Sequence, residues 1–359
     1  MVRTIPAVAG LIGAVCLAAA TPSAALEPAA DAASVRCQVR EVALKQPAYM
    51  VVDAVVRGDR LLLPDYTNGL REVDLGTGAD RRSVLAIGSG RGQVTGPQHL
   101  GCGAGRCVVL GDRYFWIYYD EDFKFVQEYA AMTTGAGAQP LVLDDRMVIA
   151  GTADRSVSGG GVPYLFVQYD DGAVVPLQEY PATLPVPDVV KRIHFAGPTA
   201  GGVGGLPDGG WLYVDPLSYG VFVFDERDRL TRAWRGANRH FRPPNFAGYS
   251  PVHDASGREY YSRWALSQVQ VKRPVALDDD LVAIVVGVPD GDLRQRHELD
   301  LYRLNGDPVA TGIELPGVVG GRLTVADAGV GRLVLVGQKS WEPSSETAVW
   351  SVSITGVDR

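Results

Sequence analysis

The side chains best suited to chemistry in this chain are its five histidines, which are His99, His194, His240, His253 and His297. An imidazole can act as an acid, a base or a metal ligand near neutral pH, so these positions are the first candidates for a site. His99 and His194 each stand at the start of a predicted apolar strand. His240 and His253 instead share a long stretch, residues 236–273, that is rich in arginine and aromatic side chains.

Residues 236–273 could bind an anion or a glycan. Arginines form charge-assisted hydrogen bonds with anionic groups, and aromatic rings supply flat apolar surfaces for stacking. Connections of this length are usually functional or disordered, and the aromatic content argues against disorder. We expect a lid over a ligand, built from Arg239, His240, Arg242, His253, Tyr261 and Trp264 with Arg263 beside them. The alternative is a loop whose aromatics pack on the flank of the fold and whose charges are solvated.

Other catalytic and metal motifs are weak or missing. The sequence has no G-x-S-x-G, H-E-x-x-H, P-loop or C-x-x-C-H pattern. The acidic stretches 278–280 and 290–292 could bind Ca²⁺, but neither has EF-hand spacing, and both are more typical of solvated turns. We therefore expect no resident cofactor or metal, with Ca²⁺ as the remaining alternative.

Three cysteines, Cys37, Cys102 and Cys107, follow the N-terminal region that contains Cys16. Cys102 and Cys107 flank a Gly-Ala-Gly-Arg turn between two predicted strands, which favours a disulfide across that hairpin. A bridge closing so small a loop would add about 2 kcal/mol to stability. The alternative is a pair of buried thiols. Cys37 would then be unpaired.

The elements that position these residues are predicted by an internal repeat. Six times, a short apolar strand leads through a turn to an alternating aromatic or aliphatic strand, in residues 61–76, 107–120, 147–172, 211–225, 281–306 and 333–352. The repeats begin about 40 to 70 residues apart, which is typical of four-stranded propeller blades. The sequence therefore predicts an all-β, six-bladed β-propeller with antiparallel blades, placed at 45–93, 94–134, 137–186, 194–236, 274–316 and 317–359.

A single strand precedes the repeats. Residues 35–44 alternate loosely in polarity and have no blade companions of their own. We expect this strand to complete the last blade and close the ring. Residues 35–359 would then form one domain, with residues 236–273 inserted and residues 26–34 as a flexible tail.

Residues 1–25 resemble a secretory signal. Arg3 supplies a positive charge, residues 7–20 are apolar, and small residues precede Leu26. This predicts export to the periplasm or the extracellular space, with an uncleaved anchor or a lipoprotein as alternatives. No later stretch is apolar for 18 residues, so no membrane insertion is expected.

The formal net charge of the chain is −7, or −7 − 1 = −8 without Arg3 of the signal. No run of five consecutive basic residues occurs. This balance disfavours nucleic acid or an anionic membrane as a partner. We expect a monomer that binds an as yet unidentified small molecule, glycan or protein.

Two blades resemble those of NHL-like and TolB-like six-bladed propellers. The resemblance rests on residues 87–93 (Ile-Gly-Ser-Gly-Arg-Gly-Gln) and 96–99 (Gly-Pro-Gln-His), followed by the strands and turn of 114–129, and on residues 215–225. It implies the fold and no activity. Related lactonases that resemble gluconolactonase hold a divalent ion with one Glu, two Asn and one Asp. This chain has four asparagines, and Asn68 and Asn305 fall in strand-end turns, so that metal set is not carried over.

In a propeller, His99 and His194 would begin inner strands and could form a polar pair at one mouth of the channel, or could be two independent histidines. The leading hypothesis is an exported, non-catalytic binding module. The alternative is a propeller hydrolase or lyase, lactonase-like, with its site at the central channel. Convergence of three or more His, Asp, Glu or Asn side chains at the channel would favour the enzyme.

Overall fold

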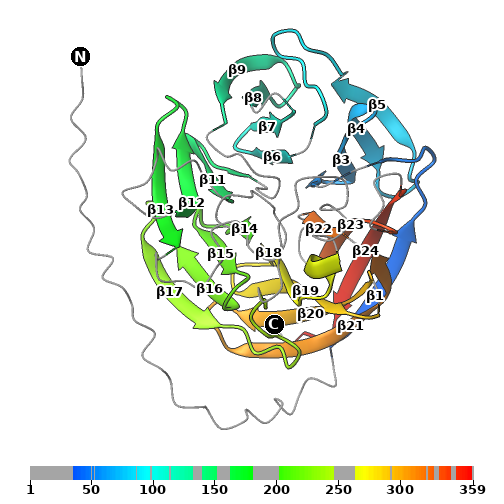
Figure 1. Ribbon diagram of the computed structural model, residues 1–359, viewed down its shortest axis with the longest axis vertical. Helices are drawn as coiled ribbons and strands as arrows, with labels where there is room; N and C mark the ends of the chain where they lie inside the picture. The colour runs from blue at the N-terminus through cyan, green and yellow to red at the C-terminus, as the bar shows by residue number, and fades with distance from the viewer. Residues whose placement is uncertain are drawn as a thin grey trace.

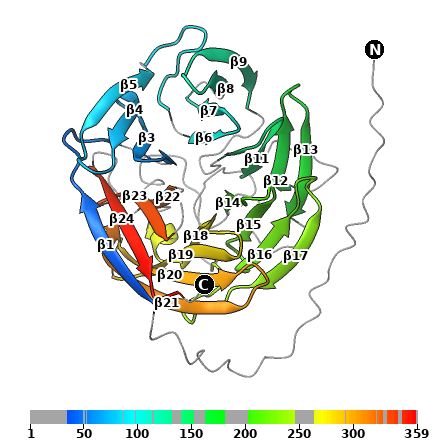
Figure 2. The same cartoon turned by 180° about the vertical axis from the view of Figure 1, so that it is seen from behind.

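The computed structural model describes residues 35–49, 51, 53–85, 87–97, 99–112, 115–131, 140–151, 162–180, 202–245, 263–291, 293–320, 322–326, 331–340 and 345–357. Within these residues, 24 strands form six antiparallel sheets of four strands each, arranged in a ring (Figures 1 and 2). The protein is therefore an all-β, six-bladed β-propeller, as the repeat predicts.

The first three blades follow one another along the chain, and each runs from the innermost strand outward. Blade 1 contains β2 (Val55–Arg57), β3 (Arg60–Asp65), β4 (Gly69–Asp74) and β5 (Asp80–Leu85). Blade 2 contains β6 (His99–Gly103), β7 (Arg106–Leu110), β8 (Phe115–Asp120) and β9 (Phe125–Ala130). Blade 3 contains β10 (Leu141–Val142), β11 (Arg146–Ala150), β12 (Val162–Tyr169) and β13 (Val174–Tyr180).

The other three blades continue around the ring. Blade 4 contains β14 (Gly202–Gly205), β15 (Trp211–Asp215), β16 (Gly220–Phe224) and β17 (Leu230–Arg235). Blade 5 contains β18 (Gln270–Ala276), β19 (Leu281–Pro289), β20 (Gln295–Arg303) and β21 (Pro308–Gly320). Blade 6 contains β22 (Arg322–Ala326), β23 (Arg332–Gln338), β24 (Thr347–Thr355) and, on its outer edge, β1 (Arg36–Val42).

Ring closure by the N-terminal strand is confirmed. β1 pairs antiparallel with β24 along its whole length, from Arg36 opposite Thr355 to Val42 opposite Val349. Figures 1 and 2 show the blue β1 alongside the red β24, so the first and last strands share one sheet. The pairing leaves blade 6 with the same four strands as the others.

The core lies between adjacent blades, because alternate side chains of each strand point to opposite faces of its sheet. Val282, Ile284 and Val286 of β19 pack toward blade 4, whereas Ala283 and Val285 pack toward blade 6. Large aromatic side chains fill several of these interfaces, among them Trp116, Trp211, Tyr213 and Tyr302. The blades are therefore held together mainly by apolar packing.

Glycines let inner strands approach one another closely at two junctions. A Cβ added to Gly101 or Gly103 of β6 would lie 2.3 or 2.2 Å from a backbone oxygen of Pro140 or Val142 in blade 3. A Cβ added to Gly204 of β14 would lie 2.2 Å from the Pro274 oxygen in blade 5. The glycine-rich stretch 202–205 is therefore an innermost strand, and only glycine fits such contacts.

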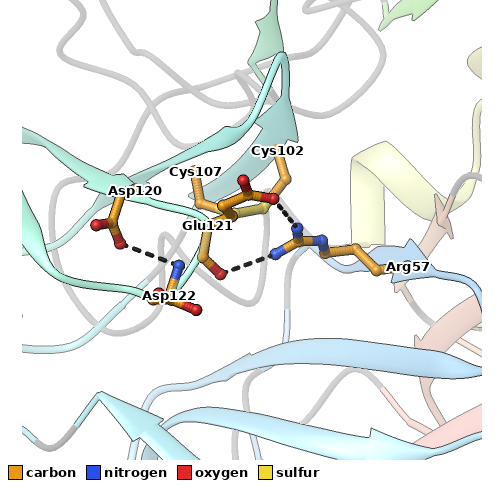
Figure 3. Close-up of a disulfide and its surroundings, with 6 residues drawn as sticks. All are labelled: Arg57, Cys102, Cys107, Asp120, Glu121 and Asp122. Carbon is orange, nitrogen blue, oxygen red and sulfur yellow. Dashed lines mark hydrogen bonds and ion pairs between the residues drawn. A yellow bond between two sulfur atoms is a disulfide. The ribbon is translucent and has the colours of Figure 1, made fainter.

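The disulfide across the first hairpin of blade 2 is confirmed. Cys102 and Cys107 lie directly opposite each other in β6 and β7, and their sulfurs are bonded. Figure 3 shows the bridge behind Glu121, whose carbonyl accepts a hydrogen bond of 3.3 Å from Arg57 of blade 1. Cys37 is a free, partly buried thiol in β1, and burial raises its pKa to about 11.

Two boundaries differ from those predicted. Blade 5 begins at Gln270 and ends at Gly320, rather than at 274 and 316. Pro274 lies at a register shift within β18, where a missing N–H is tolerated. No helix in the described ranges is long and apolar enough to cross a bilayer.

Candidate functional site

The connector after β17 is anchored to blade 5 by Asn238. The Asn238 amide nitrogen donates to Glu298 Oε2 at 3.2 Å and to Asp300 Oδ1 at 3.0 Å, and both acceptors belong to β20. Its amide oxygen accepts a hydrogen bond of 2.8 Å from the backbone N–H of His240. A single buried side chain therefore fixes the backbone of residues 238–240 against the neighbouring blade.

Glu298 and Asp300 form an acidic pair beneath this connector. They are two residues apart on β20, so they share one face of the sheet, and both are fully buried. Asp300 accepts hydrogen bonds from the Tyr219 hydroxyl at 2.6 Å and from the Gly312 N–H at 2.7 Å. Burial raises the pKa of Asp300, and these donors offset part of that rise. Buried carboxylates persist when such donors satisfy them.

Three basic side chains lie above the acidic pair. Arg296 Nη2 is 3.0 Å from Glu298 Oε1, and His240 Nε2 is 3.4 Å from the same oxygen. His240 Nε2 also lies 3.0 Å from Arg239 Nε, so it accepts this hydrogen bond when the imidazole is neutral. Glu298 thus pairs with Arg296, and His240 lies beside this pair, while Arg239 remains exposed at their edge.

Arg239 and Arg242 have no acidic partner in the part of the chain that the structure describes. Arg242 donates to the carbonyl oxygens of Arg239 at 3.1 Å and Phe241 at 2.6 Å, which fixes its guanidinium over the connector. Within the described residues, no carboxylate lies within ion-pair distance of Arg239 or Arg242, and both side chains are exposed. The arrangement can therefore bind an anionic group through two guanidiniums whose backbone is already ordered.

Trp264, predicted to stack on a ligand, is mostly buried. It lies in a short helical turn, residues 263–266, drawn in yellow in Figure 1, and is 9% exposed. Its indole N–H donates to the Asn245 carbonyl at 2.8 Å, and Gln268 accepts from the Asn245 N–H at 2.8 Å. Trp264 thus ties the two described ends of the insertion together. His253 and Tyr261 lie outside the described residues.

His99 is the first residue of β6, as expected, and is buried. Its Nδ1 lies 2.7 Å from Asp53 Oδ2, just before β2, so the pair joins blades 1 and 2 where their innermost strands begin. His194, proposed as its companion at the channel mouth, lies outside the described residues. The structure thus gives His99 a carboxylate partner that the sequence pattern did not single out.

His297 is held neutral by its surroundings. It lies on β20, facing away from Glu298 and Asp300, and its Nδ1 donates to the Val318 carbonyl at 3.0 Å. Burial lowers its pKa from 6.5 to about 4, and the nearby Lys272 adds to the decrease, while the hydrogen bond opposes it. The folded protein therefore binds this proton less well than the unfolded chain does.

We predict an acid-dependent loss of stability from His297. As pH falls from 6.5 toward 4, His297 is protonated in the unfolded chain but stays neutral in the folded protein. The free energy of unfolding therefore decreases by about 1.4 kcal/mol per pH unit. The stability difference between the wild type and His297→Gln, measured by urea unfolding at several pH values, should shrink through this window. A difference that stays constant from pH 7 to about 4 would contradict the assignment.

The described residues contain no group of three or more His, Cys, Asp or Glu side chains placed to hold a metal ion. In the acidic stretch 278–280, Asp278 Oδ1 accepts from the N–H groups of Asp280 at 2.9 Å and Leu281 at 2.8 Å. This is the hydrogen bonding of a turn. The other stretch includes Asp292, which is outside the described residues.

The sequence analysis singled out the exposed residues of this candidate site but not the residues that support them. Arg239, His240 and Arg242 are close together as expected, whereas Asn238, Tyr219, Arg296 and the acidic pair were not singled out. The sequence of β20 contains a signal for the acidic pair, because Glu298 and Asp300 alternate there with apolar residues in an otherwise buried strand. Charged side chains in such positions must be paired.

Comparison with known proteins bears on the fold of this chain. No protein-family model matches this chain, and no curated protein matches it. Among solved structures, a Bacteroides fragilis protein described as exported is 11% identical, with a TM-score of 0.58, over 91% of this chain and 96% of that one. At this identity the likeness shows a shared fold alone.

Two further solved structures match with lower TM-scores. Virginiamycin B lyase from Staphylococcus aureus is 8% identical with a TM-score of 0.44, over 89% of this chain and 99% of that one. BamB from Moraxella catarrhalis is 14% identical with a TM-score of 0.33, over 83% of this chain and 68% of that one. Their scores are too low to carry an argument about this chain.

Proposed function

We propose that this propeller is an exported, non-catalytic binding module, and that its partner presents anionic groups to the connector between blades 4 and 5. One observation carries the proposal: Arg239 and Arg242 are exposed, lack carboxylate partners in the described residues, and lie on a backbone fixed by Asn238. Because the backbone of this site is already ordered, binding of an anion to its unpaired cations loses little conformational entropy.

Most other arginines that order this ring are already neutralised by the protein itself. Paired examples are Arg71 with Asp65 and Asp80, Arg106 with Asp170, Arg146 with Asp228, and Arg229 with Asp225. The chain as a whole carries a net charge of −7. An exposed, cationic connector in an acidic protein is a local exception, and local complementarity governs recognition.

Export is supported by the pattern of residues 1–25 and by the disulfide between Cys102 and Cys107. Disulfides persist mainly in oxidising compartments, such as the periplasm and the extracellular space. A rigid ring that presents its connectors on one face suits a binding role in either compartment. The proposed partner is therefore an exported or surface-bound anionic molecule.

Charge reversal tests this proposal. We expect Arg239→Glu and Arg242→Glu each to weaken binding of a labelled polyglutamate probe by about tenfold or more, because one charge near the bound anion changes sign. Fluorescence anisotropy at low and high salt would measure it, and the loss should be largest at low salt.

Lys124→Glu is the matched control, because Lys124 is 76% exposed on blade 2 and its reversal changes the net charge equally. The control should bind like the wild type. Equal loss in the control would mean that net charge, rather than the connector, governs binding. Unchanged affinity in both arginine variants would reject the proposed site.

A further inference from the structure

β17 is the outermost strand of blade 4 and leads directly into the connector. In the described part of the chain it pairs with β16 on one side and with no strand on the other. Residues 230–233 and Arg235 are exposed. Its free edge therefore presents backbone N–H and C=O groups to solvent.

The register identifies which groups face outward. Gly236 donates its N–H to the Tyr219 carbonyl at 2.8 Å, and this contact continues the pairing of Arg235 with Gly220. Backbone bonds alternate along an antiparallel ladder, so Trp234 and Arg232 bond toward β16. Ala233 and Arg235 consequently direct their N–H and C=O groups away from the sheet.

The same edge leads into a row of cations along the chain, in which Arg232 and Arg235, three residues apart, project from opposite faces of β17. Arg232, Arg235, Arg239 and Arg242 lie within residues 230–242, and this stretch contains no Asp or Glu. All four are exposed, and in the described residues none has a carboxylate partner. The six residues of β17 span about 20 Å at 3.3 Å per residue, which exceeds the size of a single small anion.

We infer that β17 accepts an extended, acidic segment of another polypeptide as an added fifth strand, with its carboxylates along the arginine row. The inference rests on the proposed function, since it names the chemical class of the anionic partner. A polypeptide matches both features of this edge, because its backbone supplies alternating donors and acceptors while its side chains supply negative charge. A sulfated glycan matches the charge alone.

The charge also selects against a second copy of this chain. Two β17 strands placed edge to edge would bring like-charged arginine rows together, which is unfavourable. An acidic strand removes that repulsion and satisfies the exposed backbone groups. The edge is therefore blocked for self-association and open to a partner of opposite charge.

Ala233→Pro tests strand addition separately from charge. Proline removes the outward N–H of residue 233, while the hydrogen bonds of Arg232 and Trp234 toward β16 remain, and edge strands tolerate proline at such positions. The probe is a labelled peptide of about eight residues, in which pairs of glutamates alternate with pairs of threonines, so that it is long enough to cover the strand and carries carboxylates on both faces. We expect at least tenfold weaker binding, whereas Ala233→Val, which keeps the N–H, should bind like the wild type.

A second measurement leaves the protein unchanged. The same peptide, N-methylated at alternate residues, keeps its charge but cannot complete a strand ladder, so it should bind at least tenfold more weakly. Equal binding of methylated and unmethylated peptides, or wild-type affinity in a folded Ala233→Pro, would overturn strand addition. Peptide binding that depends on Arg239 and Arg242 but not on the N–H of residue 233 would do the same, while leaving the proposed anionic site intact.

Discussion

Deleting residues 35–44 should abolish the cooperative thermal unfolding of the ring. The deletion removes all seven residues of β1 and exposes the full edge of β24. It also removes Val35 from the apolar cluster shared by blades 5 and 6, and Val42 from the cluster shared by blades 6 and 1. Each buried valine contributes about 1.5–3 kcal/mol, and each ladder hydrogen bond about 1 kcal/mol.

These losses together approach the whole stability of a typical domain, about 5–15 kcal/mol. Circular dichroism during heating would measure the transition, and a dye that binds exposed apolar surface would report the opened edge. A variant that begins at residue 35 and keeps β1 is the control, and it should melt like the longer chain. An unchanged melting curve after removal of residues 35–44 would show that closure of the ring does not stabilise it.

Asp300→Ala should be the most damaging single substitution in the site, costing about 3 kcal/mol or more, because buried donors left without an acceptor each cost about 1–3 kcal/mol. The affected donors are the Tyr219 hydroxyl at 2.6 Å, the Gly312 N–H at 2.7 Å and the Asn238 amide at 3.0 Å. Urea unfolding would measure the loss. Binding to the connector should weaken as well, because Asn238 would lose one of its two acceptors.

Asp300→Asn is the matched control. Its amide oxygen can still accept from Gly312 and Asn238, and the Tyr219 hydroxyl can rotate to accept from the new amide nitrogen. We therefore expect a loss of about 1 kcal/mol for this variant. If Asn and Ala were equally harmful, the negative charge would matter rather than the hydrogen bonds. If Ala were tolerated within about 1 kcal/mol, the network would not hold the connector.

The fold was predictable because its signals are local. Alternation of apolar and polar residues identifies the strands of blades 1, 2 and 4, and the turn between Cys102 and Cys107 predicts the hairpin bridge. β1 was assigned to blade 6 by elimination, since it lacks companions nearby. The start of blade 5 was misplaced, because Pro274 looks like a boundary in sequence while the strand continues through it with a shifted register.

The site was predictable only in part, because its support depends on contacts between distant residues. Arg239, His240 and Arg242 stand out by composition. Asn238 meets Asp300 across 62 residues, and Tyr219 meets Asp300 across 81. No local sequence pattern predicts such distant partners. The role of Trp264 as an anchor likewise depends on the contact between its turn, residues 263–266, and Asn245.

The closing strand also dictates the order in which this protein can be completed. Thr355 pairs with Arg36, 355 − 36 = 319 residues earlier, so the first strand to be synthesised waits for the last. Contacts of such long range form slowly, because the entropy of closing a large loop is lost before the contacts themselves stabilise the chain. A chain that is still bound to the ribosome therefore cannot complete the ring, and the edge of its β1 stays unpaired and prone to aggregation until β24 has been synthesised.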